Sequence, residues 1–149
     1  MRGVLALALF MTQAGPPKHV DFGFWGTLVV PEGCTHVPRQ GVDSAVGHLE
    51  CGETHSRVLY DIGFASPGAK PEPRGMCTGF EGSPRPPLRV LEFQLDKGRS
   101  LFVCELPPFL DSPSRLVAVP SPTVSFHIVV KSPADASWLL TTALAFRPK

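Results

Sequence analysis

The chain reads LRVLEFQLDKGRSLFVCEL over residues 88–106, and this stretch decides the fold class. Apolar and polar residues alternate over residues 91–95, and residues 101–104, after a central Asp96-Lys97-Gly98-Arg99, are apolar. Alternation with a period of two is typical of β-strands, and a glycine between two such runs favours a tight turn. The stretch therefore predicts a β-hairpin of strands 88–95 and 100–106. The side chains expected to share one face of its first strand are Arg89, Leu91, Phe93 and Leu95.

Runs of apolar and β-branched residues recur along the rest of the chain. They are separated by segments in which most of the 17 prolines and 14 glycines gather, a spacing typical of short strands joined by turns. We expect further strands at residues 20–30, 45–51, 57–64, 115–119, 124–131 and 140–146. About seven or eight strands with little helix predict a mainly β fold, either an antiparallel β-sandwich or an open barrel.

The connections follow from the proline and glycine positions. Residues 31–44 read as a loop, residues 52–55 have the length of a hairpin turn, and residues 66–87 predict a long surface excursion or flap. Ser132-Pro133-Ala134-Asp135 has the pattern of a helix start, with a hydroxyl cap and proline at the first position. We expect this helix to be short, because residues 140–146 resemble a closing strand.

The first fourteen residues have the pattern of a secretory signal peptide. Arg2 is followed by an apolar run over residues 4–11 and by a small-residue exit at Ala14. We therefore expect a signal peptide at residues 1–14, a single domain over residues 15–149, and an exported protein, periplasmic or extracellular. A first core strand is the alternative for the same run. The run is shorter than the roughly 18 residues that a spanning helix needs, so no membrane span is expected.

Four cysteines form an even set, which in an oxidising compartment predicts two disulfides. Four cysteines allow three pairings, and the sequence does not choose between them. Our working pairing joins neighbours, Cys34 with Cys51 and Cys77 with Cys104.

Charge excludes one class of partner. Removal of Arg2 with the leader takes the 14 basic residues to 13, against 13 acidic residues. A neutral chain without basic runs is a poor candidate for nucleic acid. The chain contains no asparagine and is rich in arginine, proline, glycine and alanine, a bias typical of GC-rich bacterial genomes.

Histidines and cysteines gather in one part of the sequence. Cys34, His36, His48 and Cys51 could bind zinc in a tetrahedral site if both thiols were reduced, and His55 lies nearby. Their spacing matches no known zinc-ligand pattern, and export favours a disulfide instead. No cofactor is therefore expected.

Two further chemistries use the acidic residues. A hydrolase could use Ser44 or Asp43 with Asp61, but residues 42–46 lack the Gly-x-Ser-x-Gly frame of a strained nucleophile turn. Calcium could bind the oxygens of Asp43, Glu53 and Asp61, although no contiguous acidic loop brings them together.

Two short stretches carry a resemblance. The first runs from Pro31-Glu32-Gly33 through Gly41-Val42-Asp43-Ser44-Ala45-Val46-Gly47, and the second is Leu59-Tyr60-Asp61-Ile62-Gly63. They resemble an uncharacterised group of exported bacterial proteins with Gly-x-Asp-Ser-x-x-Gly and Tyr-Asp-x-Gly motifs. That group has no established activity, so the resemblance assigns no catalytic or binding role. Physically, Asp43, Ser44 and Asp61 could form a polar cluster between two strands, either as structural support or as a ligand pocket.

No acid, base and nucleophile set stands out in this sequence. We therefore expect an exported β module with a binding or envelope-associated structural role, without catalysis, that contacts a protein or a small molecule. The alternatives are the small secreted hydrolase and the zinc-binding domain described above.

Overall fold

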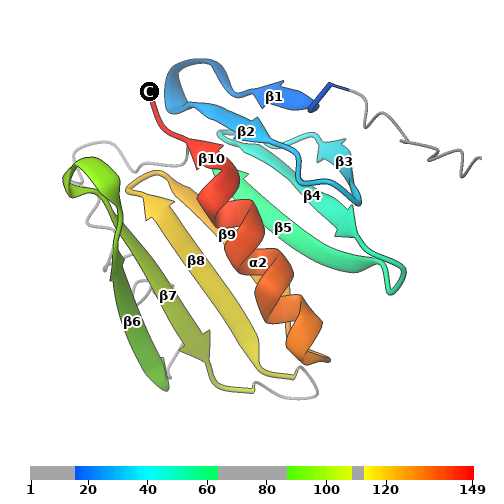
Figure 1. Ribbon diagram of the computed structural model, residues 1–149, viewed down its shortest axis with the longest axis vertical. Coiled ribbons are helices and arrows are strands. Elements are labelled where there is room, and N and C mark those ends of the chain that lie inside the picture. The colour runs from blue at the N-terminus through cyan, green and yellow to red at the C-terminus, as the bar shows by residue number, and fades with distance from the viewer. Residues whose placement is uncertain (1–15, 64–86, 109–112) are drawn as a thin grey trace, which may run out of the picture.

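The structure is a computed structural model that describes residues 16–63, 87–108 and 113–149. Ten strands, two short 3-10 turns and one α-helix, α2 (Pro133–Ala145), make up these residues (Figure 1). The strands are β1 (His19–Asp21), β2 (Thr27–Val29), β3 (Cys34–Arg39), β4 (Ala45–Cys51), β5 (Ser56–Ile62), β6 (Arg89–Gln94), β7 (Ser100–Leu106), β8 (Arg115–Ser121), β9 (Val124–Val129) and β10 (Phe146–Arg147).

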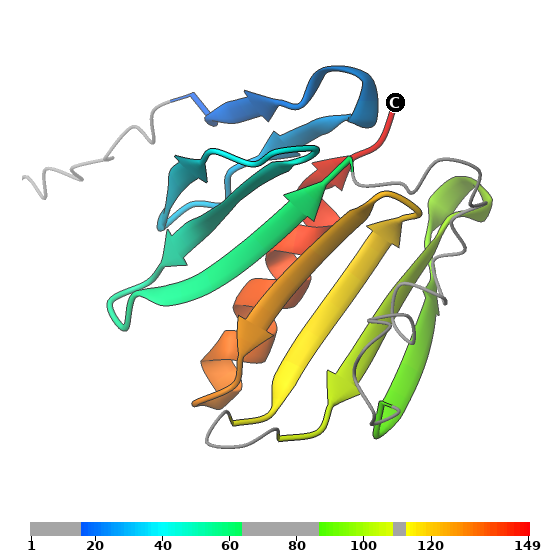
Figure 2. The ribbon, with the colours of Figure 1, turned by 180° about the vertical axis from the view of Figure 1, so that it is seen from behind.

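Seven of the strands form one antiparallel sheet in the order β3-β4-β5-β9-β8-β7-β6, seen from behind in Figure 2. The remaining strands form a small antiparallel sheet in the order β1-β2-β10. The predicted fold class, mainly β and antiparallel, is confirmed. The large sheet is open, so β3 and β6 are its two edge strands among the described residues.

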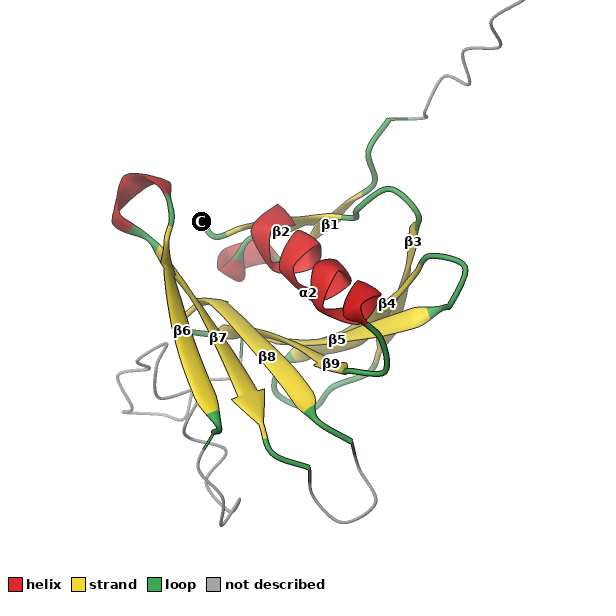
Figure 3. Ribbon diagram, turned by 60° about the horizontal axis from the view of Figure 1, so that its bottom comes forward, coloured by secondary structure: helices red, strands yellow, loops and turns green. Residues whose placement is uncertain are grey.

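The core lies between the large sheet and a second layer, which α2 and the small sheet form together (Figure 3). Along β5 and β9, every second side chain faces this layer and is buried, while its neighbours face the opposite side. The fully buried residues of this core include Leu28, Leu49, Val58, Ile62, Phe126, Leu139 and Phe146.

The clearest sequence signals are confirmed. β6 and β7 form the predicted hairpin, with Arg89 opposite Glu105 and Gln94 opposite Ser100. Its turn places Lys97 and Gly98 at φ of 62° and 70°, a left-handed conformation that favours glycine. The strands predicted near residues 45–51, 57–64, 115–119 and 124–131 are present as β4, β5, β8 and β9.

Two predictions near the N-terminus are wrong. Residues 20–30 are not one strand, because Gly23 and Gly26 adopt positive φ and fold the chain into the β1–β2 hairpin. Residues 31–44 are not all loop, because Cys34–Arg39 forms β3. Pro38 is compatible with β3 because an edge strand leaves one row of N–H groups unpaired, and proline has no N–H to lose.

The strand predicted at residues 140–146 is also wrong. α2 runs for 13 residues, and only Phe146–Arg147 continues as strand β10. The helix starts as predicted, since Ser132 and Asp135 form a capping box. It continues because its buried residues fall three or four positions apart, on one helical face. Those residues are Asp135, Leu139, Thr142 and Ala143.

The disulfide between Cys34 and Cys51 joins two residues that lie opposite each other in the β3–β4 ladder. Cys104 is also disulfide-bonded. Its predicted partner Cys77, the predicted excursion at residues 66–87 apart from residue 87, and the predicted signal peptide at residues 1–14 lie outside the described residues. No described helix is long and apolar enough to cross a membrane.

Candidate binding groove

α2 covers only part of the large sheet. The helix packs against β5, β9 and β8, near the middle of the sheet, so edge strand β6 extends beyond it (Figure 3). Leu91 and Phe93 of β6 face the helix layer, yet each is 44% exposed. Large apolar side chains next to a core and open to solvent are typical of a binding surface.

A hollow of about 200 Å³ lies between this part of the sheet and the first half of α2. Most of its wall is apolar, and Arg89 and Glu105 also line it, with Nε of Arg89 3.9 Å from Oε2 of Glu105. The apolar residues of the wall are Leu91, Phe93, Val103 and Leu116 from the sheet and Ala136, Leu139 and Leu140 from α2.

A second hollow, of about 270 Å³, follows the first along the helix. Leu140 lines the first and Leu144 the second, and residues four apart lie on the same helical face. We call the two hollows together the α2–β6 groove. The wall of the second hollow consists of Gln94, Leu95, Asp96, Arg99, Pro120, Ala143, Leu144, Phe146 and Arg147.

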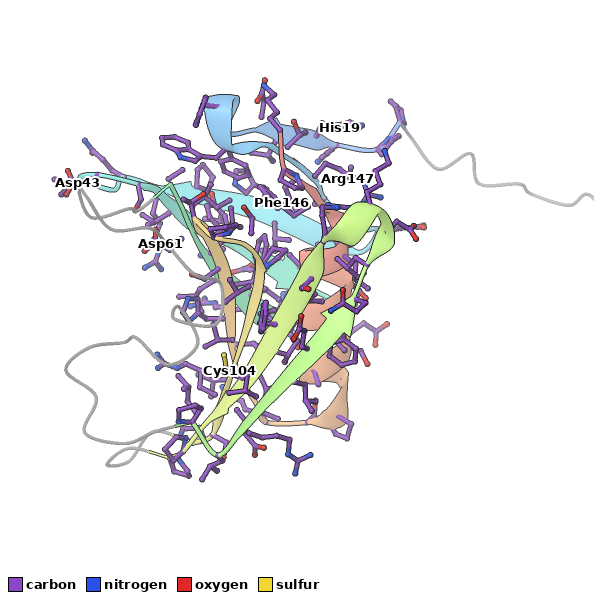
Figure 4. All side chains as sticks on the ribbon, turned by 90° about the vertical axis from the view of Figure 1, so that its left-hand side faces the viewer. His19, Asp43, Asp61, Cys104, Phe146 and Arg147 are labelled. Carbon is purple, nitrogen blue, oxygen red and sulfur yellow. A yellow bond between two sulfur atoms is a disulfide. The ribbon has the colours of Figure 1, made fainter. Side chains whose placement is uncertain are left out.

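The second hollow carries most of the charge of the groove. Arg99 comes from the β6–β7 turn, and Arg147 lies beside Phe146 at the C-terminal end of α2 (Figure 4). Arg147 donates a hydrogen bond from Nη1 to the carbonyl oxygen of Leu144 at 2.9 Å. Among the described residues, Asp96 is the one acidic residue in the wall of this hollow. The groove therefore changes from apolar to cationic along the helix.

The sequence predicts that three of the lining residues share a face of a strand, but it does not predict the groove. Arg89, Leu91 and Phe93 share a face as expected from their alternation. Alternation does not reveal that α2 stops short of β6, so it gives no sign that this face is open. Four of the other lining residues, Leu140, Ala143, Leu144 and Phe146, come from the segment 140–146, which the sequence assigned to a strand.

The polar residues predicted as a cluster lie in different settings. Asp43 and Ser44 belong to the loop that joins β3 and β4, whereas Asp61 lies within β5 (Figure 4). Among the described residues, no hydrogen bond joins Asp61 to either of the other two. Oδ1 of Asp61 is buried without a hydrogen-bond partner there. Of the predicted calcium residues, Glu53 lies in the β4–β5 turn, at the opposite end of that hairpin from Asp61.

The predicted zinc residues do not converge. The sulfur atoms of Cys34 and Cys51 are bonded to each other, so neither is a thiolate ligand. His36 and His48 occupy alternate faces of the β3–β4 ladder, since their partners are Leu49 and Val37.

These two histidines have protein partners instead. Nε2 of His36 lies 2.7 Å from the hydroxyl of Tyr60, and the two rings stack. Burial, aided by the charge of His48, lowers the pKa of His36, and burial raises the pKa of Tyr60. Nε2 of His48 lies 3.3 Å from Oε1 of Glu50. Both histidines therefore belong to the packing of the β3–β5 region.

The sequence patterns did not predict one serine–histidine pair that the structure contains. Ser125 and His127 lie on the face of β9 that is opposite to α2, with Oγ and Nε2 2.9 Å apart. The two residues are two positions apart in a predicted strand, which places both side chains on one face of the sheet, and this spacing could have indicated the pair. Burial, with the charge of Arg115, lowers the pKa of His127 to about 4, although Asp61 raises it.

This pair is poorly suited to catalysis. A pKa near 4 makes His127 a weak general base at neutral pH. Ser125 is only 5% exposed, and β9 has ladder partners on both sides, so its N–H groups are committed to the sheet. An activated serine needs free N–H donors that stabilise an oxyanion. The pair therefore acts as a buried polar contact of the sheet.

Comparison of the chain with protein-family models, with curated proteins and with solved structures found no match.

Proposed function

We propose that this chain is an exported, non-catalytic binding domain whose ligand lies in the α2–β6 groove. The observation that carries the proposal is the exposure of Leu91 and Phe93 in the wall of an apolar hollow beside the core. Leaving these side chains open to water forfeits the free energy of burying them, about 25 cal/mol per Å². A bound apolar group would recover that free energy.

Export is supported by the Cys34–Cys51 disulfide and by the leader at residues 1–14. Disulfides form and persist in oxidising compartments, such as the periplasm or the extracellular space. The near-neutral charge of the chain supports a ligand other than nucleic acid.

The test is binding of Nile red, an uncharged dye whose fluorescence rises in apolar sites. Phe93→Ser removes an aromatic wall of the groove, and burial of such a side chain is worth about 1.5–3 kcal/mol. We therefore expect the wild type to bind the dye and Phe93→Ser to bind it at least about tenfold more weakly.

Phe24→Ser is the matched control, because Phe24 is 87% exposed and lies outside the groove. It should bind the dye like the wild type. Circular dichroism of both variants checks that the fold is retained. No dye binding by the wild type, or equal losses in the two variants, would contradict the proposal.

A further inference from the structure

The α2–β6 groove has two chemically different ends. Its first half is walled by apolar side chains on both sides, including Phe93 and Leu140. Its second half presents the guanidinium groups of Arg99 and Arg147. Both halves follow one face of α2, and the distance along the axis from Ala136 to Leu144 is about 12 Å at 1.5 Å per residue.

The two arginines have no acidic partner among the described residues. Within the part of the chain that the structure describes, no carboxylate oxygen lies within 4.0 Å of a side-chain nitrogen of either residue. Asp96 shares the wall but forms no such pair, so two positive charges face one negative charge. Arg147 uses Nη1 for the carbonyl of Leu144 and keeps its other N–H groups for a further acceptor.

This arrangement is complementary to an anionic head group. Guanidinium groups bind carboxylates through charge-assisted hydrogen bonds, which are stronger than those between neutral groups. An apolar chain attached to that head would extend along α2 into the first hollow and cover Leu91 and Phe93. Each buried methylene adds roughly 0.8 kcal/mol of hydrophobic free energy.

We propose that the groove binds a single-chain anionic amphiphile of the fatty-acid type, with its carboxylate at Arg99 and Arg147 and its chain along Leu91, Phe93 and Leu140. The proposal rests on the function proposed above, because it names the class of ligand for the same groove. It adds the requirement of a negative charge at one defined end.

The test compares three probes with the same chain and different heads: dodecanoate, dodecanol and dodecyltrimethylammonium. Each is titrated below its micelle-forming concentration, with displacement of bound Nile red as the readout. We expect dodecanoate to bind at least tenfold more tightly than dodecanol, and the cationic probe to bind most weakly.

Substitutions of the arginines then test whether Arg99 and Arg147 bind the carboxylate. Arg99→Gln and Arg147→Gln should each weaken dodecanoate binding about tenfold while leaving dodecanol binding unchanged. Arg39→Gln, on β3 at the opposite edge of the sheet, is the control and should change neither. Arg99→Lys, which keeps the charge, should retain part of the preference for dodecanoate.

The outcomes separate this inference from the proposed function. Equal binding of dodecanoate and dodecanol, or no effect of the arginine substitutions, overturns the inference and leaves an apolar binding groove in place. Binding only to anionic vesicles, and not to monomeric dodecanoate, also overturns it. Failure of every probe to bind overturns both proposals. Both proposals are also overturned if light scattering shows that the wild type is a dimer and that Phe93→Ser is a monomer. In that case a second copy of the chain would cover the groove.

Discussion

Ser56 donates a hydrogen bond of 2.6 Å to Oδ1 of Asp135, across 79 residues of sequence. Ser56 begins β5 and Asp135 lies in the first turn of α2, so this contact attaches the helix to the sheet. The other carboxylate oxygen, Oδ2, accepts hydrogen bonds from the backbone N–H groups of Lys131 and Ser132. Burial alone raises the pKa of Asp135, but these bonds and the charge of Lys131 hold it below its ordinary value.

Substitution of Asp135 should therefore destabilise the whole domain. Asp135→Ala leaves the Ser56 hydroxyl and the backbone N–H groups of Lys131 and Ser132 without their acceptor, and Asp135 itself is only 5% exposed. We expect a loss of about 1–3 kcal/mol in the free energy of unfolding, measured by urea denaturation. Asp43→Ala, at an exposed loop residue, should stay within about 0.5 kcal/mol of the wild type. Similar losses for both variants would argue against this role of Asp135.

His127 should make the fold sensitive to mild acid. Its pKa of about 4 in the folded chain lies below the ordinary value of 6.5. Unfolded chains therefore bind this proton near pH 6.5, whereas folded chains resist it until about pH 4. His127 therefore leaves the free energy of unfolding unchanged above about pH 6.5. As the pH falls from 6.5 to 4, protonation of the unfolded chain lowers that free energy by on the order of 3 kcal/mol.

The check is urea denaturation between pH 7 and pH 4 for the wild type and His127→Gln. We expect the variant to lose much less stability than the wild type across this range. His19→Gln, in exposed strand β1, controls for the removal of a histidine. Parallel curves for the wild type and His127→Gln would show that His127 is not the source of the acid sensitivity.

The Cys34–Cys51 bridge should contribute to stability through the unfolded state. It joins residues 17 apart, and closing such a loop is worth about 3 kcal/mol in the chain-entropy model. We expect the Cys34→Ala/Cys51→Ala double variant to lose about that much, measured by denaturation without reductant. Peptide mass mapping under non-reducing conditions should find this bridge and the predicted Cys77–Cys104 bridge. Four alkylatable thiols in the freshly purified protein would contradict both.

Hydrolase activity should be absent. We expect the wild type to cleave p-nitrophenyl esters no faster than buffer, because Ser125 is buried and His127 is a weak base. Ser44→Ala and Ser125→Ala should not change that rate. An ester-cleaving rate that falls in either variant would favour the hydrolase alternative, and the variant affected would identify the nucleophile.

Local patterns predicted the hairpin of β6 and β7 and most central strands. β5 and β9 alternate apolar and polar residues because one face meets the core and the other does not. The predicted sharing of a face by Leu91 and Phe93 is correct for the same reason. The sequence places Gly47 within a predicted strand but does not say why a glycine is there. The structure gives the reason, because a Cβ atom at this position would collide with the Tyr60 hydroxyl and the carbonyl oxygen of Val37.

Local sequence patterns did not predict the length of α2. Thr141 and Thr142 favour a strand by intrinsic preference, and this preference led to the wrong prediction at residues 140–146. The capping box and the burial of Leu139, Thr142 and Ala143 on one helical face overcome it. Intrinsic preferences differ by less than 1 kcal/mol per residue, so burial against the sheet decides.

The sequence by itself determined the mainly β class, the strands with clear alternation and the start of α2, because these depend on neighbours along the chain. Tertiary structure decided how far α2 extends and which strands it covers. Contacts such as Ser56 with Asp135 join distant segments, and no local pattern reports them. The α2–β6 groove exists because the helix lies over β5, β9 and β8 while β6 extends past it, so its apolar wall and its two arginines meet only in the folded chain.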